Sequence, residues 1–344
     1  MKKFKFRFSQ INPTLLLMLA FIAIGCILNM LFTMSFDVLN DFHQISFLKP
    51  MREQSLISPY YYSVLLLLGI NIILSTSLAL LNGFTGLFTM GHAGFMAIGA
   101  YTAAYVVKSY LPTAAPMLQL FTALAVGSLS ASLFGLCIGF AGLRLSGDYL
   151  GMVTLGFSEI IRVSLLNIEA VGGARGMTDI PQFINLGMVT LIALIVIILV
   201  KRIRDGRFGR AMFAVKENEM AANLIGINPL EVKVRAFVLS SALAGVAGVC
   251  FAFSEGYLST QTFTFVKSFE IIAMNVIGGL GSLSGAILGG AMLSLLPEVL
   301  RKVQDFTGVD IRMVLYALTM ILIMILRPKG LLGQKEWKWL SSPN

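Results

Sequence analysis

The sequence predicts an all-α, polytopic integral membrane protein with about ten transmembrane helices, some of them broken or re-entrant. Hydrophobic residues make up 57% of the 344 residues, charged residues only 12%, and the mean hydropathy is +0.84. A soluble domain is about a quarter charged. Apolar runs of about 20 residues, the length that crosses a bilayer, recur along the whole chain. No polar stretch is long enough for a separate soluble domain, so residues 1–344 are interpreted as one transmembrane domain.

Each predicted span is an apolar run between polar or glycine-rich breaks. The spans are Thr14–Met34, Tyr60–Leu81, Phe88–Lys108, Pro116–Gly142, Tyr149–Asn167, Leu186–Val200, Arg235–Ser254, Val266–Ile277, Leu283–Val299 and Ile311–Leu326. The first run follows a basic N-terminus, as in a signal peptide, but it continues past Cys26 to Met34. We therefore interpret it as an uncleaved first span.

The distribution of Lys and Arg predicts the orientation, because basic loops stay in the cytoplasm. The basic residues within Lys2–Arg7 place the N-terminus there, and six spans then bring Lys201–Arg210 to the same side. Four more spans return Arg327 and Lys329 to it. Both termini are therefore predicted to be cytoplasmic. An alternative is that the short run Val266–Ile277 is re-entrant and does not cross the membrane. The number of crossings after Arg210 would then be odd, which would change the predicted side of the C-terminus.

The composition argues against several other functions. The net charge of +9 is expected from cytoplasmic Lys and Arg, and no basic patch is interleaved with aromatic residues, so we expect no nucleic-acid binding. Cys26, Cys137 and Cys250 lie inside apolar runs and are interpreted as small hydrophobic residues. His43 and His92 have no ligand partners at metal-site spacing. No catalytic motif appears, so we expect no catalytic residue, no metal and no cofactor bound by this chain, and no enzyme.

The most informative stretch is a polar island between apolar runs, residues 206–232. Residues at helical spacing within it are Glu217, Met220, Ala221 and Leu224. They predict a short amphipathic helix that ends at Gly226. Such a helix could lie on lipid, but the acidic side chains of Glu217 and Glu219 disfavour an anionic membrane surface. A short helix that inserts into a groove on a soluble cytoplasmic partner fits better.

Two segments, Asn82–Gly99 and Ile277–Gly290, contain glycines where a spanning helix should be smooth. One interpretation is close helix packing through small residues. The other is broken or re-entrant half-helices that line a cavity, because irregular backbone at membrane depth must be buried in protein or face water. Repeats of inverted topology would place the two segments on opposite faces of the membrane. The span count places both on the cytoplasmic side, so one of these two expectations is wrong.

Three charged residues belong to the predicted fifth span or its edge. Asp148 lies at the edge, whereas Glu159 and Arg162 are three residues apart, share a helix face and can pair. Such charges either neutralise each other and lock two helices together, or contact substrate or a gate. A secondary transporter without ATP would need carboxylates within the spans, and only Glu159 and Glu270 qualify.

Five motifs taken together resemble a known family. They are SGDYLGMVTLGFSEIIR (Ser146–Arg162), VGGARGM (Val171–Met177), AVKENEMAANLIGINPLEVKVRAFVLSSALAGVAG (Ala214–Gly248), IGGLGSLSGAILG (Ile277–Gly289) and LRPKGLLG (Leu326–Gly333). From about Tyr60 to Gly333 the chain resembles the permease subunit of bacterial branched-chain amino acid ABC importers, in particular the M-type member of the permease pair. Urea and short-amide permeases are close relatives of that family with similar motifs, so they remain an alternative.

The resemblance implies a subunit of an ATP-driven importer that moves Leu, Ile or Val into the cytoplasm by alternating access. It implies a second homologous permease subunit as partner in a heterodimer. Two cytoplasmic ATP-binding subunits would hold ATP and Mg, and a periplasmic or surface substrate-binding protein would deliver the amino acid. The resemblance also implies the bilayer of the bacterial cytoplasmic (inner) membrane as the location.

The matched motifs also imply site residues. The segment that matches the family's coupling loop contains Glu217, Asn218, Glu219, Ala221, Ala222 and Gly226. The implied candidates for the pathway lining are Asn82, Gly83, Gly86, Gly91 and His92 in the first glycine segment and Gly278, Gly279, Gly281 and Gly285 in the second. A zwitterion there could place its carboxylate at half-helix N-termini. Many relatives have Pro or Asn after the paired glycines where this chain has Ala174-Arg175, and the added cation could alter which solute is favoured.

Overall fold

The computed structural model describes residues 59–142, 147–307, 312–327, 330–333, 335–337 and 340. The described residues form helices joined by loops, with one isolated β-bridge between Met177 and Leu258. The predicted first span, Thr14–Met34, lies outside them, as do the basic N-terminal residues Lys2–Arg7.

The remaining predicted spans all coincide with helices. In chain order the elements are α2 (Pro59–Leu78), the π-helical turn η3 (Ala79–Thr85), α3 (His92–Tyr110), α4 (Pro116–Gly142), α5 (Asp148–Asn167), the 3-10 turns η4 (Glu169–Val171) and η5 (Gly173–Arg175), α6 (Leu186–Asp205), α7 (Arg207–Glu217), α8 (Glu219–Leu224), α9 (Pro229–Glu255), η6 (Thr260–Phe263), α10 (Phe265–Gly278), α11 (Leu283–Thr307) and α12 (Arg312–Leu326). Six helical segments of the described part are long and apolar enough to cross a membrane. The chain is thus a polytopic all-α membrane protein, as predicted, while the total of about ten spans stays a prediction.

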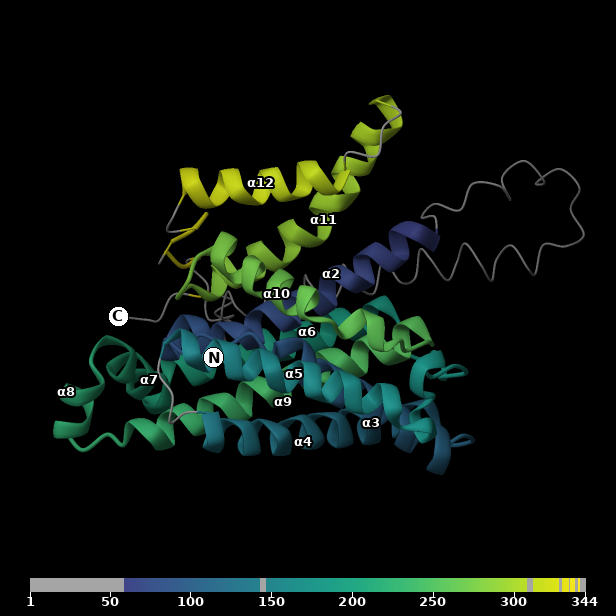
Figure 1. Ribbon diagram of the computed structural model, residues 1–344, viewed down its shortest axis with the longest axis horizontal. Helices are drawn as coiled ribbons and strands as arrows, with labels where there is room; N and C mark the ends of the chain where they lie inside the picture. Colours follow the sequence, from purple (N-terminus) through teal and green to yellow (C-terminus); the bar gives the residue numbers. More distant parts are fainter. Residues whose placement is uncertain are drawn as a thin grey trace, which may run out of the picture.

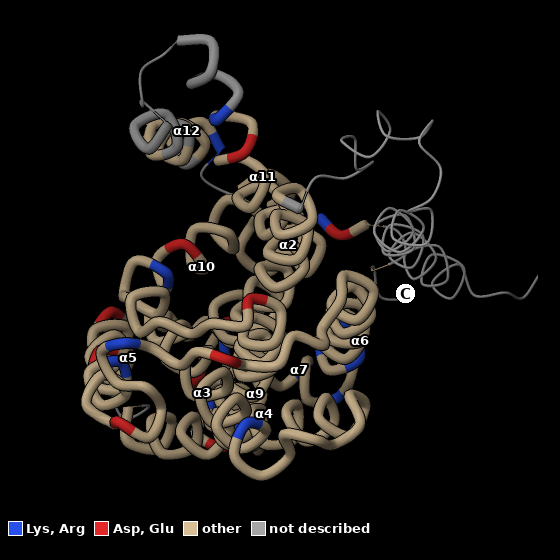
Figure 2. The backbone as a smooth tube through the Cα atoms, turned by 90° about the vertical axis from the view of Figure 1, so that its right-hand side faces the viewer, with Lys and Arg blue, Asp and Glu red and all other residues tan. Residues whose placement is uncertain are grey.

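The interior of the bundle is held together by close backbone contacts at glycines. Figure 2 shows α3 and α9 among α4, α5 and α6, whereas α2, α11 and α12 extend to one side. A Cβ added at Gly99 of α3 would lie 2.4 Å from the Gly245 Cα of α9, and one added at Gly245 would lie 2.5 Å from the Gly127 carbonyl oxygen of α4. Small residues let helices approach this closely, which drives helix association in lipid through van der Waals contact.

The two ends of the bundle differ. Figure 1 shows α7 and α8 projecting at one end, which we call the α8 end, while the connection between α5 and α6 lies at the opposite end. The polar island predicted at residues 206–232 is made of α7, α8 and the start of α9. The start of α9 is earlier than predicted because Pro229 occupies its first turn and Asn228 Oδ1 accepts a hydrogen bond from the Glu231 N–H at 3.4 Å.

The glycine segments break the helices less than the sequence suggests. Asn82 and Gly83 lie within the π-helical turn, so the first break is only residues 86–91, and the second break is only residues 279–282. Gly86 (φ +73°) and Gly279 (φ +125°) adopt backbone angles that favour glycine, and these end the preceding helices. A Cβ at Gly83 would lie 3.2 Å from the Gly281 nitrogen, so the two segments meet at the α8 end. The expectation that they lie on opposite faces is therefore wrong.

Candidate functional site

The α7–α8 unit is not the single helix that the sequence predicts. Asn218, directly after α7, is extended (φ −158°, ψ 107°), and its Oδ1 accepts a hydrogen bond from the Ala221 N–H at 3.0 Å. The asparagine thus caps α8, as this residue type commonly does. Glu217 is the last residue of α7 and does not share a helix with Leu224, so that part of the prediction is wrong. Gly226 follows α8 with φ +87° and turns the chain towards α9.

The short helix α8 and Ile225, which follows it, expose apolar side chains. Met220 is 81% exposed, Leu224 88% and Ile225 73%. On the other side Ala222 is buried, and Glu219 Oε2 forms an ion pair with Lys233 Nζ of α9 at 2.6 Å. The ion pair holds α8 against α9 while the three side chains, which we call the α8 ridge, point away from the chain. An exposed apolar ridge on a helix is the feature that a groove on a partner would take up.

Lys216, in the last turn of α7, joins this unit to both glycine segments. Its Nζ donates a hydrogen bond to the Gly83 carbonyl oxygen at 2.7 Å. A Cβ at Gly86 would lie 3.0 Å from the Lys216 Cγ, and one at Gly281 would lie 3.5 Å from its Nζ. The sequence alone does not mark this lysine as functional. Lys216 is one of several basic residues in a basic region, and its position directly before Glu217 is the one sequence signal that could have drawn attention to it.

The second glycine segment is packed against the chain's own backbone. A Cβ at Gly278 would lie 1.9 Å from the Gly285 carbonyl oxygen, so α10 and α11 touch here without intervening side chains. The Leu331 N–H donates to the Ile277 carbonyl oxygen at 2.8 Å, and the Leu332 N–H donates to that of Gly278 at 3.1 Å. These bonds satisfy the last carbonyls of α10, as helix ends require.

The C-terminal segment is anchored at the α8 end by a partly buried ion pair. The carboxylate of Glu336 accepts hydrogen bonds from the backbone N–H groups of Leu283 at 2.7 Å and Ser284 at 3.0 Å, and so caps α11. Arg204, at the end of α6 and only 7% exposed, pairs with the same carboxylate and also donates to the Leu340 carbonyl oxygen. This arrangement ties α6, α11 and the C-terminal segment together.

The part of the first glycine segment around His92 is enclosed. The His92 side chain is buried, with its Nε2 2.6 Å from the Ser77 Oγ. The Ala93 N–H at the start of α3 donates to the Ser268 Oγ of α10 at 3.2 Å, and a Cβ at Gly91 would lie 2.6 Å from the Thr154 carbonyl oxygen. The structure therefore brings the residues at positions 83, 86 and 281 together near Lys216, whereas Gly91 lies against Thr154 and His92 pairs with Ser77. A role of these residues in a pathway stays a prediction.

The charges of α5 are divided between its two ends. Arg162 Nε donates to Glu159 Oε2 at 2.7 Å, which is the pair that their spacing predicts. The other oxygen, Oε1, accepts a hydrogen bond from the Phe265 N–H at the start of α10 at 3.1 Å. Glu159 thus connects α5 to α10. Asp148 is exposed in the first turn of α5, where its charge suits the helix dipole, and it lies far from this pair.

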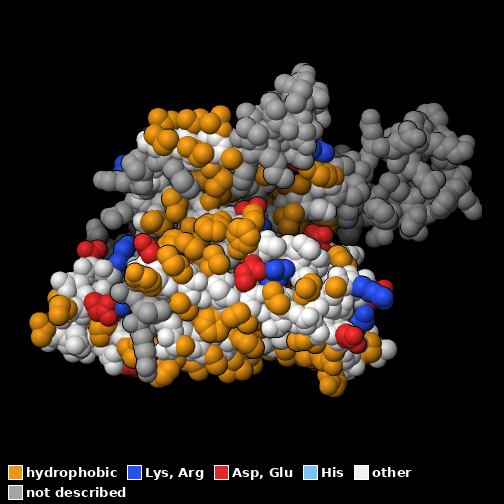
Figure 3. All heavy atoms as spheres, viewed as in Figure 1, with side chains coloured by type: hydrophobic (Ala, Val, Ile, Leu, Met, Phe, Trp, Pro, Cys, Tyr) orange, Lys and Arg blue, Asp and Glu red, His pale blue; other side chains and the backbone are white. Residues whose placement is uncertain are grey.

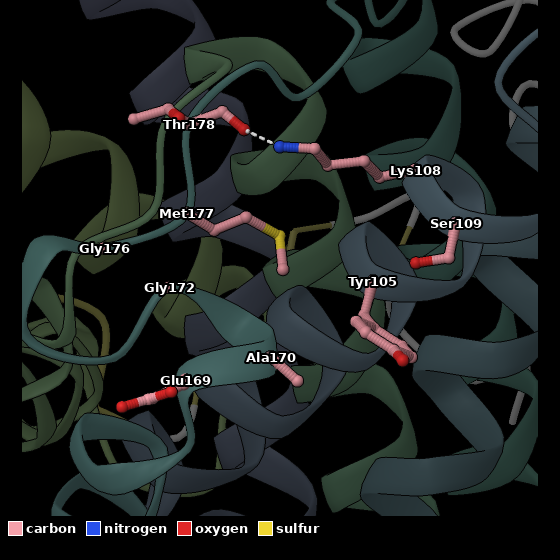
Figure 4. Close-up of a pocket in the computed structure, with 9 residues that line it drawn as sticks. All are labelled: Tyr105, Lys108, Ser109, Glu169, Ala170, Gly172, Gly176, Met177 and Thr178. Carbon is pink, nitrogen blue, oxygen red and sulfur yellow. Dashed lines mark hydrogen bonds between the residues drawn. The ribbon is translucent and has the colours of Figure 1, made fainter.

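A pocket of about 400 Å³ opens at the end opposite α8. Figure 4 shows its lining side chains, which come from α3 and from the connection after α5, with Lys108 reaching towards Thr178. The Lys108 Nζ donates to the Thr178 carbonyl oxygen at 2.7 Å and lies 3.8 Å from an oxygen of Asp179. The β-bridge of Met177 with Leu258 holds this loop against the chain after α9. The loop from Gly172 to Thr178 thus forms one wall of a polar pocket.

The chain is similar in sequence to proteins of a known family. Residues 60–324 match the family model described as "Branched-chain amino acid transport system / permease component". The chain is 35% identical over 298 residues to the high-affinity branched-chain amino acid transport system permease protein LivM of Escherichia coli, covering 76% of this chain and 68% of that protein. It is 27% identical over 220 residues to LivH of the same bacterium, covering 64% of this chain and 65% of that protein.

A further relative is BraD of Pseudomonas aeruginosa, also a high-affinity branched-chain amino acid transport system permease protein. The chain is 25% identical to it over 303 residues, which cover 80% of this chain and 97% of that protein. No solved structure matches the chain significantly. The family match extends from the first described helix to the last, and so includes α8, both glycine segments and the pocket at the opposite end. The chain therefore belongs to the family of permease components of branched-chain amino acid transport systems.

Proposed function

We propose that this chain is the permease subunit of an ATP-binding-cassette importer that moves leucine, isoleucine and valine into the cytoplasm. The observation that carries the proposal, beyond family membership, is the α8 ridge joined through Lys216 to both glycine segments. A passive channel or an anchored enzyme has no use for an exposed apolar helix connected in this way to broken membrane helices. The chain itself turns over no substrate and binds no cofactor.

The partners follow from the same features. The α8 ridge docks into a groove on one of two cytoplasmic ATP-binding subunits, which hold ATP and Mg, with Glu217, Asn218, Glu219, Ala221, Ala222 and Gly226 as the coupling residues. A second homologous permease completes the membrane part, supported by the chain's likeness to both LivM and LivH. A periplasmic or surface substrate-binding protein docks at the opposite end, around the polar pocket. The α8 end and both termini are then on the cytoplasmic side of the bacterial inner membrane.

The mechanism is a rigid-body switch between two states. When ATP closes the ATP-binding subunits, they move α8, and Lys216 transmits this movement to the backbone at Gly83. Because the two glycine segments touch each other at Gly83 and Gly281, both shift together. The cavity between the two permeases then changes from outward to inward facing. ATP and the loaded binding protein must each interact differently with the two states, since only differential binding shifts an equilibrium.

The test is ATP hydrolysis by the complete complex reconstituted in lipid. The binding protein is added with leucine, isoleucine, valine or urea, each measured separately. Stimulation by the three amino acids and not by urea supports the proposal. Stimulation by urea alone would refute the assignment of branched-chain amino acids as substrates. It would still agree with an ATP-driven importer, because urea permeases share these motifs. If no solute changes the rate of ATP hydrolysis, the importer proposal fails.

A further inference from the structure

A cluster of polar side chains joins three helices of the bundle, α2, α10 and α11, and is separate from the glycine segments. The Lys267 Nζ of α10 lies 3.0 Å from the Glu270 Oε2 one turn along and 3.4 Å from the Asn71 Oδ1 of α2. The Asn71 Nδ2 donates in turn to the Ser294 Oγ of α11 at 2.8 Å. We call these four residues the amphoteric cluster, because it holds one cation and one anion beside neutral polar groups.

The amphoteric cluster lies at membrane depth. Asn71 is near the middle of the span Tyr60–Thr85, and Ser294 is near the middle of Leu283–Thr307. The helix α10 has only 14 residues, about 21 Å at 1.5 Å per residue, which is shorter than a bilayer's hydrocarbon core of about 30 Å. Lys267 is in its first turn. The α10 helix therefore begins within the membrane and carries its charge pair there.

The charges of the cluster are not enclosed by the chain. The side chain of Glu270 is 38% exposed and that of Lys267 is 20% exposed. On the same helix Phe265 and Phe269 are 49% and 44% exposed. Figure 3 shows charged side chains between hydrophobic ones on the face of the molecule that it draws. A charge facing lipid at the bilayer centre is costly, so such residues usually face a bundle interior or a water-filled cavity.

The α5 pair provides a contrast within the same chain. Both oxygens of Glu159 are used, one by Arg162 and one by the Phe265 N–H, so this carboxylate is fully committed to holding α5 and α10 together. In the cluster, Glu270 uses one oxygen, and its Oε1 has no hydrogen-bond partner among the described residues. Lys267 uses two of the three donors that an ammonium group offers. The cluster thus retains an acceptor and a donor of opposite charge.

We propose that the amphoteric cluster binds the α-amino acid zwitterion in transit, an assignment that rests on the proposed function. Lys267 takes the carboxylate, Glu270 takes the ammonium group, and the exposed rings of Phe265 and Phe269 contact the aliphatic side chain. When the zwitterion binds, the Lys267–Glu270 ion pair is replaced by two ion pairs, one between Lys267 and the solute carboxylate and one between Glu270 and the solute ammonium group. Since the zwitterion is neutral overall, no net charge enters the membrane. Because the Lys267–Glu270 pair must open first, binding is weak, which allows the solute to leave as well as to enter.

The first test separates binding from a merely structural ion pair. Leucine uptake and basal ATP hydrolysis are measured on the complete complex in proteoliposomes, for Glu270→Gln, Lys267→Met and the double variant. Loss of one charge-assisted hydrogen bond to the solute predicts an uptake rate lowered about tenfold or more in each single variant, and at least as low in the double variant. Basal ATP hydrolysis shows whether each variant complex has assembled with its ATP-binding subunits. A double variant that transports like the wild type would show a structural pair only and overturn the proposal.

The second test does not depend on transport by a substituted complex. In a background without Cys26, Cys137 and Cys250, the substitution Glu270→Cys is exposed to a charged, water-soluble methanethiosulfonate reagent. The matched control is Leu133→Cys on α4, whose side chain is 61% exposed on an apolar helix face. Fast labelling at position 270, slow labelling at 133 and protection of 270 by leucine with binding protein are expected. Equal labelling of both, or no protection, would overturn the cluster assignment. Absence of wild-type leucine uptake would instead refute the proposed function.

Discussion

Replacing Lys216 with Met should uncouple ATP hydrolysis from transport. The substitution keeps a long side chain beside Gly86 but removes the hydrogen bond from Nζ to the Gly83 carbonyl oxygen, which is 2.7 Å long and partly buried. A hydrogen bond from a charged donor contributes about 1.5–3 kcal/mol. If this bond exists in only one of the two transport states, its loss shifts their equilibrium by roughly 10- to 150-fold.

The assay is the number of leucine molecules taken up per ATP hydrolysed in proteoliposomes. For Lys216→Met this ratio should fall about tenfold or more, in line with the free energy of the lost bond, while ATP hydrolysis continues. Arg210→Met is the matched control, because Arg210 lies on the same helix and its described hydrogen bond reaches only the Asp205 carbonyl oxygen at 3.3 Å. Lys216→Arg, which keeps the charge, should retain part of the coupling. A wild-type ratio in Lys216→Met would refute the role of this residue.

Three further outcomes are expected. Leu224→Asp places a charge on the α8 ridge, so the ATP-binding subunits should be lost from the complex in pull-down experiments while the chain still folds. Arg204→Met removes the cationic partner of the partly buried Glu336 carboxylate. The loss of this charged hydrogen bond costs about 1–3 kcal/mol and should lower the midpoint of thermal unfolding in detergent; an unchanged midpoint would contradict the ion pair. Gly278→Ala places a Cβ 1.9 Å from a carbonyl oxygen and should destabilise the chain by at least about 1–3 kcal/mol. The matched control is Gly156→Ala, which should be neutral or slightly stabilising because a Cβ there meets nothing within 4 Å.

The fold was largely predictable because apolar runs report where a helix lies in lipid. The ends of helices were less predictable, since a helix can continue beyond the apolar run. The α6 helix extends to Asp205 through charged residues, although the apolar run ends at Val200. At η3 the helix likewise continues through Asn82 and Gly83, because a π-helical turn accommodates them before Gly86 ends it. Hydrophobicity does not encode these local backbone states.

The candidate site was predictable where its signal is local. The exposed residues around Glu219 and the turn at Gly226 follow from helix chemistry, and the break at Asn218 could have been found from its preference for the N-cap position. Contacts between segments that are distant in the sequence could not be predicted. Lys216 meets Gly83 across 133 positions and Arg204 meets Glu336 across 132, and no periodicity or spacing relates such pairs. The same holds for Lys267 and Asn71, which are 196 positions apart.

Accumulation of labelled leucine inside proteoliposomes tests the central claim most directly. The vesicles contain the complete complex, with ATP supplied to the ATP-binding subunits and loaded binding protein on the opposite side. The account predicts accumulation against a leucine gradient that requires ATP hydrolysis, persists when ionophores collapse all ion gradients, and disappears in Leu224→Asp. Accumulation that needs an ion gradient and continues without ATP would contradict the account and show a secondary transporter instead.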